Sequence, residues 1–235
     1  MTRARRRLAR AAALGLAILT SAGPAAAGAI VDPTDTLGAG RVRLDGTGVG
    51  VFTREIRLEE SDRIVDTSGR TFAIGGAFGL LDGLDGFLTV GATRLALDED
   101  DALPSGDFDG DVGFAFGGGL RYRFVDERYF KVGSSVSISR NESAKGDVEA
   151  TWIDGEFLLG ASLHAFRDVV PFAGLSIGII RGQFDGPFGR IDFRQENVVG
   201  AMAGLRYAAT SQVEATLAGR LFDREEVSFA LSFGF

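Results

Sequence analysis

Large apolar residues recur at every second position along several stretches of the chain. In the stretch 111–124 they are Val112, Phe114, Phe116, Leu120, Tyr122 and Phe124. The intervening positions hold mainly glycine, alanine and arginine. A period of two is typical of a β-strand whose two faces differ. The pattern therefore predicts an all-β protein.

Ten such strands can be placed along the chain. We expect them at 41–57, 71–81, 87–97, 111–124, 129–140, 148–163, 170–181, 193–207, 212–221 and 227–235. Most are close to the 9–11 residues that a tilted strand needs to cross a bilayer. Eight strands are the alternative, because 41–57 is interrupted by glycines and 87–97 is partly apolar on both faces.

The face opposite the large apolar residues separates a membrane barrel from a soluble sandwich. A sandwich buries its large side chains between two sheets and exposes charge outside. Here the opposite face is mostly small, with scattered arginine and glutamate, which suits a narrow barrel interior. Only helices and closed barrels satisfy the backbone in a bilayer, and no stretch is long and apolar enough for a helix. We expect a single closed antiparallel transmembrane β-barrel over 41–235.

The connections between the strands predict an orientation. Those at 82–86, 125–128, 164–169 and 208–212 are short, whereas those at 58–70, 98–110 and 182–191 are longer and polar. Outer-membrane barrels have short periplasmic turns and longer outer loops. Both termini are therefore expected on the periplasmic side.

The first 27 residues have the pattern of a secretory signal peptide. Arg3, Arg5, Arg6, Arg7 and Arg10 precede an apolar stretch from Ala11 to Leu19, and Ala25–Ala27 provide small residues for cleavage. We expect cleavage after Ala27 and a periplasmic segment at 28–40; a retained anchor is the alternative. The chain has no cysteine, which excludes lipoprotein attachment, disulfides and Cys-ligated metals.

Removal of this segment makes the chain strongly acidic. Of its 25 basic residues five are removed, which leaves 20 against 32 acids, a net charge of −12. Nucleic-acid binding depends on basic side chains that neutralise phosphates. Nucleic acid is therefore not an expected partner.

The last strand carries the most specific signal. Val227, Phe229, Leu231, Phe233 and Phe235 alternate with small residues up to a terminal phenylalanine. In this the chain resembles the bacterial outer-membrane β-barrel proteins, including the small OmpA-type and porin-like barrels. The resemblance implies a place in the outer membrane, with Phe233 and Phe235 as the signal for the barrel-insertion machinery. It also implies contact with periplasmic chaperones, outer-membrane lipid and lipopolysaccharide.

Enzymatic chemistry has one candidate. His164 is the only histidine, and Ser162 lies two residues before it. A Ser–His nucleophile needs a hydrogen bond between the two and a third, orienting group. A turn histidine is the favoured interpretation, so no catalytic residue is expected.

Metal chemistry also has one candidate, the acidic loop at 98–111. Asp107, Asp109 and Asp111 have the spacing of the first half of an EF-hand loop, but Val112 and Gly118 replace its required glycine and glutamate. A solvated acidic loop is favoured, and no metal or cofactor is expected.

The aromatic residues fit a membrane interface. Tyr122, Phe124, Tyr207, Phe233 and Phe235 lie near expected periplasmic strand ends. Trp152 shares a face with Asp154 and Glu156; an interface aromatic displaced by a bulge is favoured over a lumen residue.

Strand parity turns most charged residues of the strands inward. We expect a network that closes the lumen, made of Arg121, Arg123, Arg206, Glu214, Arg220, Asp154 and Glu156. The same parity turns inward Arg41, Arg43, Asp45, Lys131 and Glu149. The expected function is a non-enzymatic barrel with a structural or surface-interaction role. A narrow channel for small solutes is the alternative, and an enzyme acting on lipid A or peptides is less favoured.

Overall fold

Eleven antiparallel strands make up the described part of the chain, which in this computed structural model comprises residues 32–98, 103–104, 106–166 and 168–235. They are β1 (Val42–Leu58), β2 (Arg63–Leu81), β3 (Leu84–Leu97), β4 (Gly113–Asp126), β5 (Phe130–Lys145), β6 (Val148–Leu163), β7 (Val169–Gly186), β8 (Gly189–Gln195), β9 (Val199–Ala208), β10 (Val213–Leu221) and β11 (Glu225–Gly234). None of the described residues forms a helix that could cross a membrane. The expected signal peptide lies outside the described residues.

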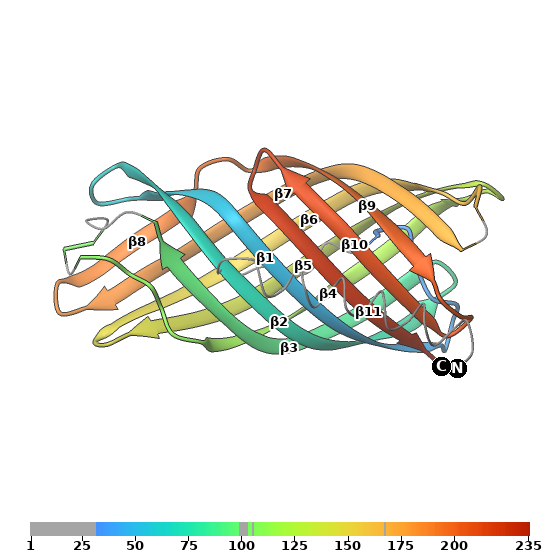
Figure 1. The fold of residues 1–235 in the computed structure, drawn as a ribbon, viewed down its shortest axis with the longest axis horizontal. Coiled ribbons are helices and arrows are strands. Elements are labelled where there is room, and N and C mark those ends of the chain that lie inside the picture. The colour runs from blue at the N-terminus through green and yellow to red at the C-terminus, as the bar shows by residue number, and fades with distance from the viewer. Residues whose placement is uncertain (1–31, 99–102, 105, 167) are drawn as a thin grey trace, which may run out of the picture.

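Ten of these strands form a closed ring (Figure 1). Neighbours pair along the order β1 to β7, then β9, β10 and β11. The ring closes where β11 pairs with β1, with Arg43 opposite Gly234. The all-β barrel and its ten strands are thus confirmed. Below, the end at which β1 begins and β11 ends is the proximal end, and the opposite end is the distal end.

The strand expected at 193–207 is divided in two. Both β8 and β9 pair with β7, and the ladder is interrupted at 196–198. The other edge of β8 pairs with the end of β1 at Ile56–Leu58, because the β10–β11 hairpin stops short of this level. The β10–β11 hairpin is therefore absent from the distal part of the ring, where β8 joins β1 directly.

Several strands are longer than the sequence indicated. The expected loops at 58–70 and 182–191 are wrong, since β2 begins at Arg63 and β7 runs to Gly186. The reason is that apolar and polar residues still alternate in these extensions, but here the apolar residues face the interior and the polar residues face outward. Val65 and Phe184 are apolar, buried and inward, whereas polar residues face out.

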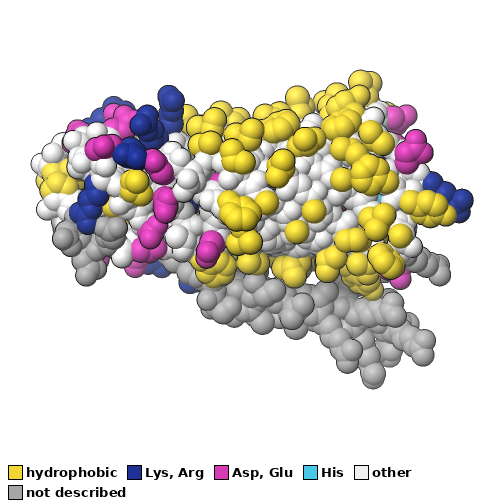
Figure 2. Space-filling model, turned by 90° about the horizontal axis from the view of Figure 1, so that it is seen from above, with side chains coloured by type: hydrophobic (Ala, Val, Ile, Leu, Met, Phe, Trp, Pro, Cys, Tyr) yellow, Lys and Arg dark blue, Asp and Glu magenta, His cyan; other side chains and the backbone are white. Residues whose placement is uncertain are grey.

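A belt of large apolar side chains surrounds the ring on its outer face (Figure 2). Its members include Phe72 (48% exposed), Ile74 (69%), Leu88 (73%), Phe116 (50%) and Ile179 (52%). Tyr122, Phe124, Phe233 and Phe235 are also exposed, at the proximal strand ends. Charged side chains gather at the two ends of the molecule instead.

The interior of the distal end is an apolar core. Fourteen buried residues form it, among them Ile56, Val65, Trp152, Phe184 and Phe193. The Phe184 ring lies 4.9 Å from that of Phe193 and 5.2 Å from that of Phe108, measured between ring centroids. The distal end is therefore packed like a small soluble domain.

Candidate functional site: the filled lumen

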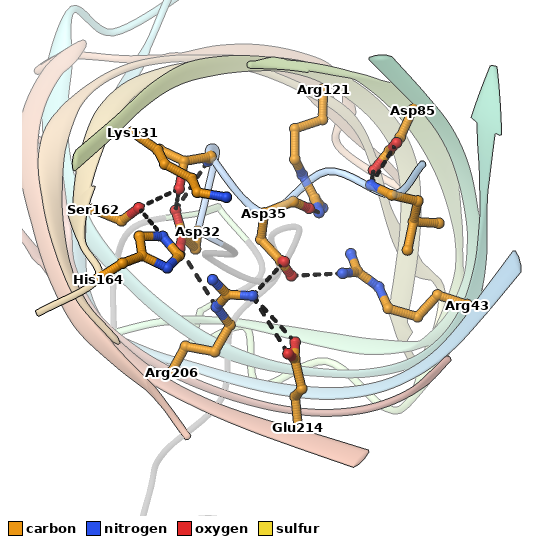
Figure 3. Close-up of polar contacts among 12 residues, drawn as sticks. Asp32, Asp35, Arg43, Asp85, Arg121, Lys131, Ser162, His164, Arg206 and Glu214 are labelled. Carbon is orange, nitrogen blue, oxygen red and sulfur yellow. Dashed lines mark hydrogen bonds and ion pairs between the residues drawn. The ribbon is translucent and has the colours of Figure 1, made fainter. Parts of the chain in front are cut away.

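The proximal mouth of the barrel contains the chain's own N-terminal segment (Figure 3). Asp32 and Thr34 are 0% and 1% exposed. Residues 32–40 precede β1 and belong to the segment at 28–40 that the sequence predicts to be periplasmic. Here their first residues lie among the side chains of the barrel wall, so this segment fills the mouth. We call residues 32–37 the plug segment.

Asp35 joins the plug segment to three arginines of the wall. Its carboxylate lies 2.6 Å from Nη1 of Arg43 on β1 and also pairs with Arg206 on β9. Its backbone carbonyl accepts a hydrogen bond of 2.6 Å from Nη1 of Arg121 on β4. Charge-assisted bonds of this kind are about twice as strong as neutral ones. One residue therefore ties three strands together across the lumen.

Carboxylates of the wall complete the proximal network. Glu214 lies 3.3 Å from Nη1 of Arg206, and Asp45 lies 3.1 Å from Nε of Arg43. Asp85 is fully buried and accepts hydrogen bonds of 2.9 Å on both oxygens from the backbone N–H of Leu37. The plug segment is thus held at both of its ends.

A chain of hydroxyl groups connects the plug segment to His164. The Thr34 hydroxyl donates to Asp32 (2.7 Å) and lies 2.6 Å from Oγ of Ser162, which in turn lies 3.0 Å from Nε2 of His164. Burial lowers the pKa of His164, and the charge of Lys131 lowers it further. The histidine is therefore neutral at pH 7.

Ser162 and His164 are hydrogen-bonded as in a Ser–His nucleophile, but no substrate can reach the serine hydroxyl. Ser162 is 2% exposed and is covered by Thr34. The second ring nitrogen of His164 has no carboxylate bound to it in the described contacts. The arrangement fastens the plug segment rather than presenting a hydroxyl to a substrate.

A second network crosses the lumen nearer the distal end. Arg220 lies 2.5 Å from Glu156, and Arg224 pairs with Glu156 and lies 3.3 Å from Asp154 and 2.7 Å from Glu226. Arg220 and Arg224 are 1% and 2% exposed. Arg54 joins the network through Asp154 at 3.5 Å. Buried guanidinium groups and carboxylates therefore fill the cross-section at this level.

Strand parity could not find two of these arginines. Arg54 follows a register shift in β1 between Val51 and Arg54, which reverses the sense of the alternation. Arg224 lies in the turn between β10 and β11, where alternation has no meaning. The register of β1 against β2 shows the change for Arg54, and the ion pairs of Arg224 with acids of the distal network show that its side chain lies in the lumen.

The residues expected in one network fall into three groups. Arg121, Arg206 and Glu214 lie in the proximal network, and Asp154, Glu156 and Arg220 lie in the distal one. Arg123 lies apart from both and pairs with Asp126 at 2.8 Å, near the proximal turn.

Of three other charged side chains expected inside, one is inward and two are exposed. Lys131 is opposite the buried Ser162, points into the barrel (Figure 3) and pairs with Asp126 at 3.1 Å. Arg41 and Glu149 are exposed, and the inward placement of Glu149 is wrong because β6 at this level turns the apolar Val148 and Ala150 inward.

A small cavity lies between the two networks. Its volume is about 70 Å³, and it is lined by apolar residues such as Phe87 and Leu158 as well as by Ser135, Arg121 and Asp154. The lumen therefore narrows to a short gap with charged groups at both of its ends.

Trp152 lies inside the barrel and not at its outer surface. It is 1% exposed in the distal core, and the β5–β6 and β6–β7 ladders run through it without a register shift. The interface interpretation and its bulge are therefore wrong. Gly182 faces it from β7, where a Cβ would lie 2.5 Å from Cβ of Trp152, so glycine makes room for the indole.

The acids of the 98–111 loop that the structure describes do not converge. Asp107 pairs with Lys145 (2.8 Å) and Asp109 with Arg94 (2.5 Å), on different strands. The hydrogen bond from Lys145 lowers the pKa of Asp107. Among the described residues no group of acids and histidine is arranged to hold a metal ion. The loop is not simply solvated, since Leu103 and Phe108 are buried in the distal core.

The sequence matches no protein-family model and no curated protein. Among solved structures it is similar to the outer membrane protease OmpT from Escherichia coli, with a TM-score of 0.49 and 10% identity over 86% of this chain and 100% of that chain. It is similar to Ail, the attachment invasion locus protein of Yersinia pestis, with a TM-score of 0.43 and 12% identity over 84% and 99% of the two chains. For Neisserial surface protein A the values are 0.36, 14%, 83% and 96%. What this chain shares with these bacterial outer-membrane proteins is the closed antiparallel barrel, at identities too low to give any residue a role.

Proposed function

We propose that the protein is a non-enzymatic outer-membrane barrel whose lumen is closed by its own side chains and plug segment. The observation that carries this proposal is the occupation of the lumen: Asp35 binds three wall arginines at the proximal mouth. A barrel with its own carboxylate at the mouth has no continuous path for solutes. Its role is then structural, or lies in what its outer surface contacts.

The outer surface supports the membrane location. A continuous belt of exposed apolar side chains would be costly in water, whereas in a bilayer it contacts lipid. In the closed ring each strand pairs with a neighbour on both sides, which is how a barrel satisfies its backbone in a bilayer. The longest connection, between Leu97 of β3 and Gly113 of β4, and the charged distal surface then face outward, toward lipopolysaccharide.

The burial of Ser162, the nucleophile candidate of the sequence, supports a protein without enzymatic activity. The hydroxyl of Ser162 is enclosed by Thr34 and cannot reach a substrate while the plug segment is in place. The outward faces around it are apolar. A peptide or lipid A substrate would need a site at the distal end, where the described interior is a packed apolar core.

Cell fractionation with activity assays tests this proposal. Cells that express the full chain should retain it in the outer-membrane fraction, in a form whose gel mobility changes on heating, as a folded barrel's does. Their lipid A mass spectrum and peptide-cleavage activity should equal those of cells without the gene. Recovery in the soluble fraction, or a new lipid A species, would contradict the proposal.

A further inference from the structure

Four outward arginines form a row on neighbouring strands at the distal edge of the apolar belt. In the ladders Arg140 is opposite Ile153, Ile153 opposite Arg181, Arg181 opposite Arg194, and Arg194 opposite Arg57. Directly opposite residues of antiparallel strands point to the same face. The row therefore presents four guanidinium groups and one isoleucine on the outside of the barrel.

Such a row is unfavourable unless an anion compensates it. Like charges directly opposite each other destabilise a sheet, and Arg181, Arg194 and Arg57 are successive partners. The compensation by the protein is uneven. Arg57 has two close carboxylates, Glu196 at 2.7 Å and Asp62 at 2.5 Å.

The other arginines of the row are less well compensated. Among the described residues Arg194 forms one long ion pair, with Glu59 at 3.8 Å between side chains that are 54% and 50% exposed, and Glu196, which is bound to Arg57, lies near enough to feel its charge. Arg140 pairs with Glu142 at 3.2 Å and remains 54% exposed. Arg181 is exposed and forms no ion pair with any described residue. The uncompensated charge is thus centred on Arg181.

The row lies where the apolar surface ends. On the outward face of β7 Ile177 and Ile179 precede Arg181, and they are 45% and 52% exposed. Figure 2 shows Lys and Arg side chains gathered where the hydrophobic belt stops toward the distal end. A shallow groove of about 300 Å³ lies beside Arg181, and Arg190 lines it together with Glu59 and Asp192, whose carboxylates pair with Arg194 and Arg190 and so leave Arg181 as its unpaired charge.

We propose that Arg181 and Arg194, flanked by Arg140, bind a phosphate group on the headgroup of a lipid in the leaflet at the distal end. This inference rests on the membrane location proposed above. Two guanidinium groups on adjacent strands can each offer a planar pair of donors to phosphate oxygens. The exposed side chains of Ile153, within the row, and Ile179, just below it, would contact the same lipid's acyl chains.

Thermal unfolding of the full-length barrel in a neutral detergent tests the site. The probes are lipid A, the same lipid A with its phosphates removed, and inorganic phosphate at equal concentration. The variants are the double substitution Arg181→Gln and Arg194→Gln, and the matched control Arg94→Gln. Arg94 of β3 is also outward and distal, but its charge is compensated by Asp109 at 2.5 Å.

Lipid A should raise the Tm of wild type and of the Arg94 control by about 2–4 °C, because a ligand of the native state stabilises it by mass action. The double variant should lose at least half of this gain. The inference is overturned if the double variant keeps the whole gain, if wild type shows none, or if lipid without phosphates acts equally well. An equal effect of inorganic phosphate also overturns it, in favour of a free-anion site. Cell fractionation tests the proposed location separately. A barrel that is found in the outer membrane but shows no phosphate-dependent rise in Tm refutes only this inference.

Discussion

At the scale of single residues, the lumen depends on carboxylates that neutralise buried arginines. Removing one partner of a buried ion pair leaves an uncompensated charge, which costs far more than the pair itself contributes. Asp35 is the most connected of these carboxylates, since it contacts three arginines of three strands. The proximal network should therefore be most sensitive to this residue.

Asp35→Asn should lower the free energy of unfolding by up to about 3 kcal/mol, because Arg43 and Arg206 lose their shared counter-charge. Chemical denaturation of the barrel in detergent measures this. Asp62→Asn is the matched control, since its carboxylate also pairs with an arginine but is 81% exposed. Equal, small effects of the two substitutions would show that the plug segment is not held by charge.

Acid should weaken the fastening of the plug segment at His164. Burial lowers the pKa of His164 below 6.5, so below pH 6.5 the unfolded chain binds a proton before the native protein does. Stability is therefore lost as the pH falls from 6.5 through the lowered pKa. The loss should be below about 1 kcal/mol, because the ring is partly exposed.

The Tm of wild type and of His164→Gln, measured between pH 7.5 and 5, tests this effect. Wild type should lose more of its Tm on acidification than the variant, whose amide does not titrate. Parallel pH profiles would exclude His164 as the titrating group.

Only part of this residue-level picture could be predicted from the sequence. Alternation within a strand places Arg121 and Arg206 inward because nothing disturbs the parity there. It could not find Arg54, which follows a register shift, or Asp35, which lies in no strand. No local pattern indicates that a segment before the first strand turns back into the lumen.

At the scale of elements, the strands continue beyond the membrane belt and change the meaning of their two faces. Within the belt, apolar residues face outward; beyond it, Val65 of β2 and Phe193 of β8 face inward. An alternating pattern looks the same in both regions. The ten strands could therefore be predicted from the sequence, whereas the extensions of β2 and β7 were indistinguishable from polar loops.

Phe108→Ala should destabilise the distal core by about 3–5 kcal/mol, the cost of removing a buried phenylalanine and leaving a cavity. Phe108 is 1% exposed and packs edge-on against Phe184. Hydrogen exchange at the amides of Leu97 and Gly110, which bond to the loop and to β3, should report local loosening. Val112→Ala, at a position 71% exposed, should change neither stability nor exchange. A Phe108 variant as stable as this control would show that the loop is not part of the core.

At the scale of the whole molecule, the barrel is closed at three levels. The plug segment occupies the proximal mouth, an Arg–carboxylate network crosses the middle, and an apolar core fills the distal end. Barrels of about eight strands are nearly filled by their own side chains, and only much larger ones leave a wide aqueous channel. A closed lumen is what the strand number favours and what the side chains produce.

The orientation of the barrel predicts at which end an introduced cysteine reacts with a reagent added outside the cell. With no native cysteine, Pro104→Cys in the distal loop should react with a membrane-impermeant thiol reagent on intact cells. Ser211→Cys in an exposed proximal turn should not. Asp85, which lies in β3 next to a proximal turn, is unsuitable as a probe because its carboxylate holds Leu37. Labelling of the Ser211 variant alone would invert the barrel.

Single-channel recording of the purified full-length wild-type barrel in planar bilayers tests the closed lumen most directly. The charge networks and the plug segment predict no stable conductance, and at most brief openings that become more frequent in the Asp35→Asn variant. Stable, large conductance of the wild-type protein would contradict the account, and the narrow channel would then be the function to pursue.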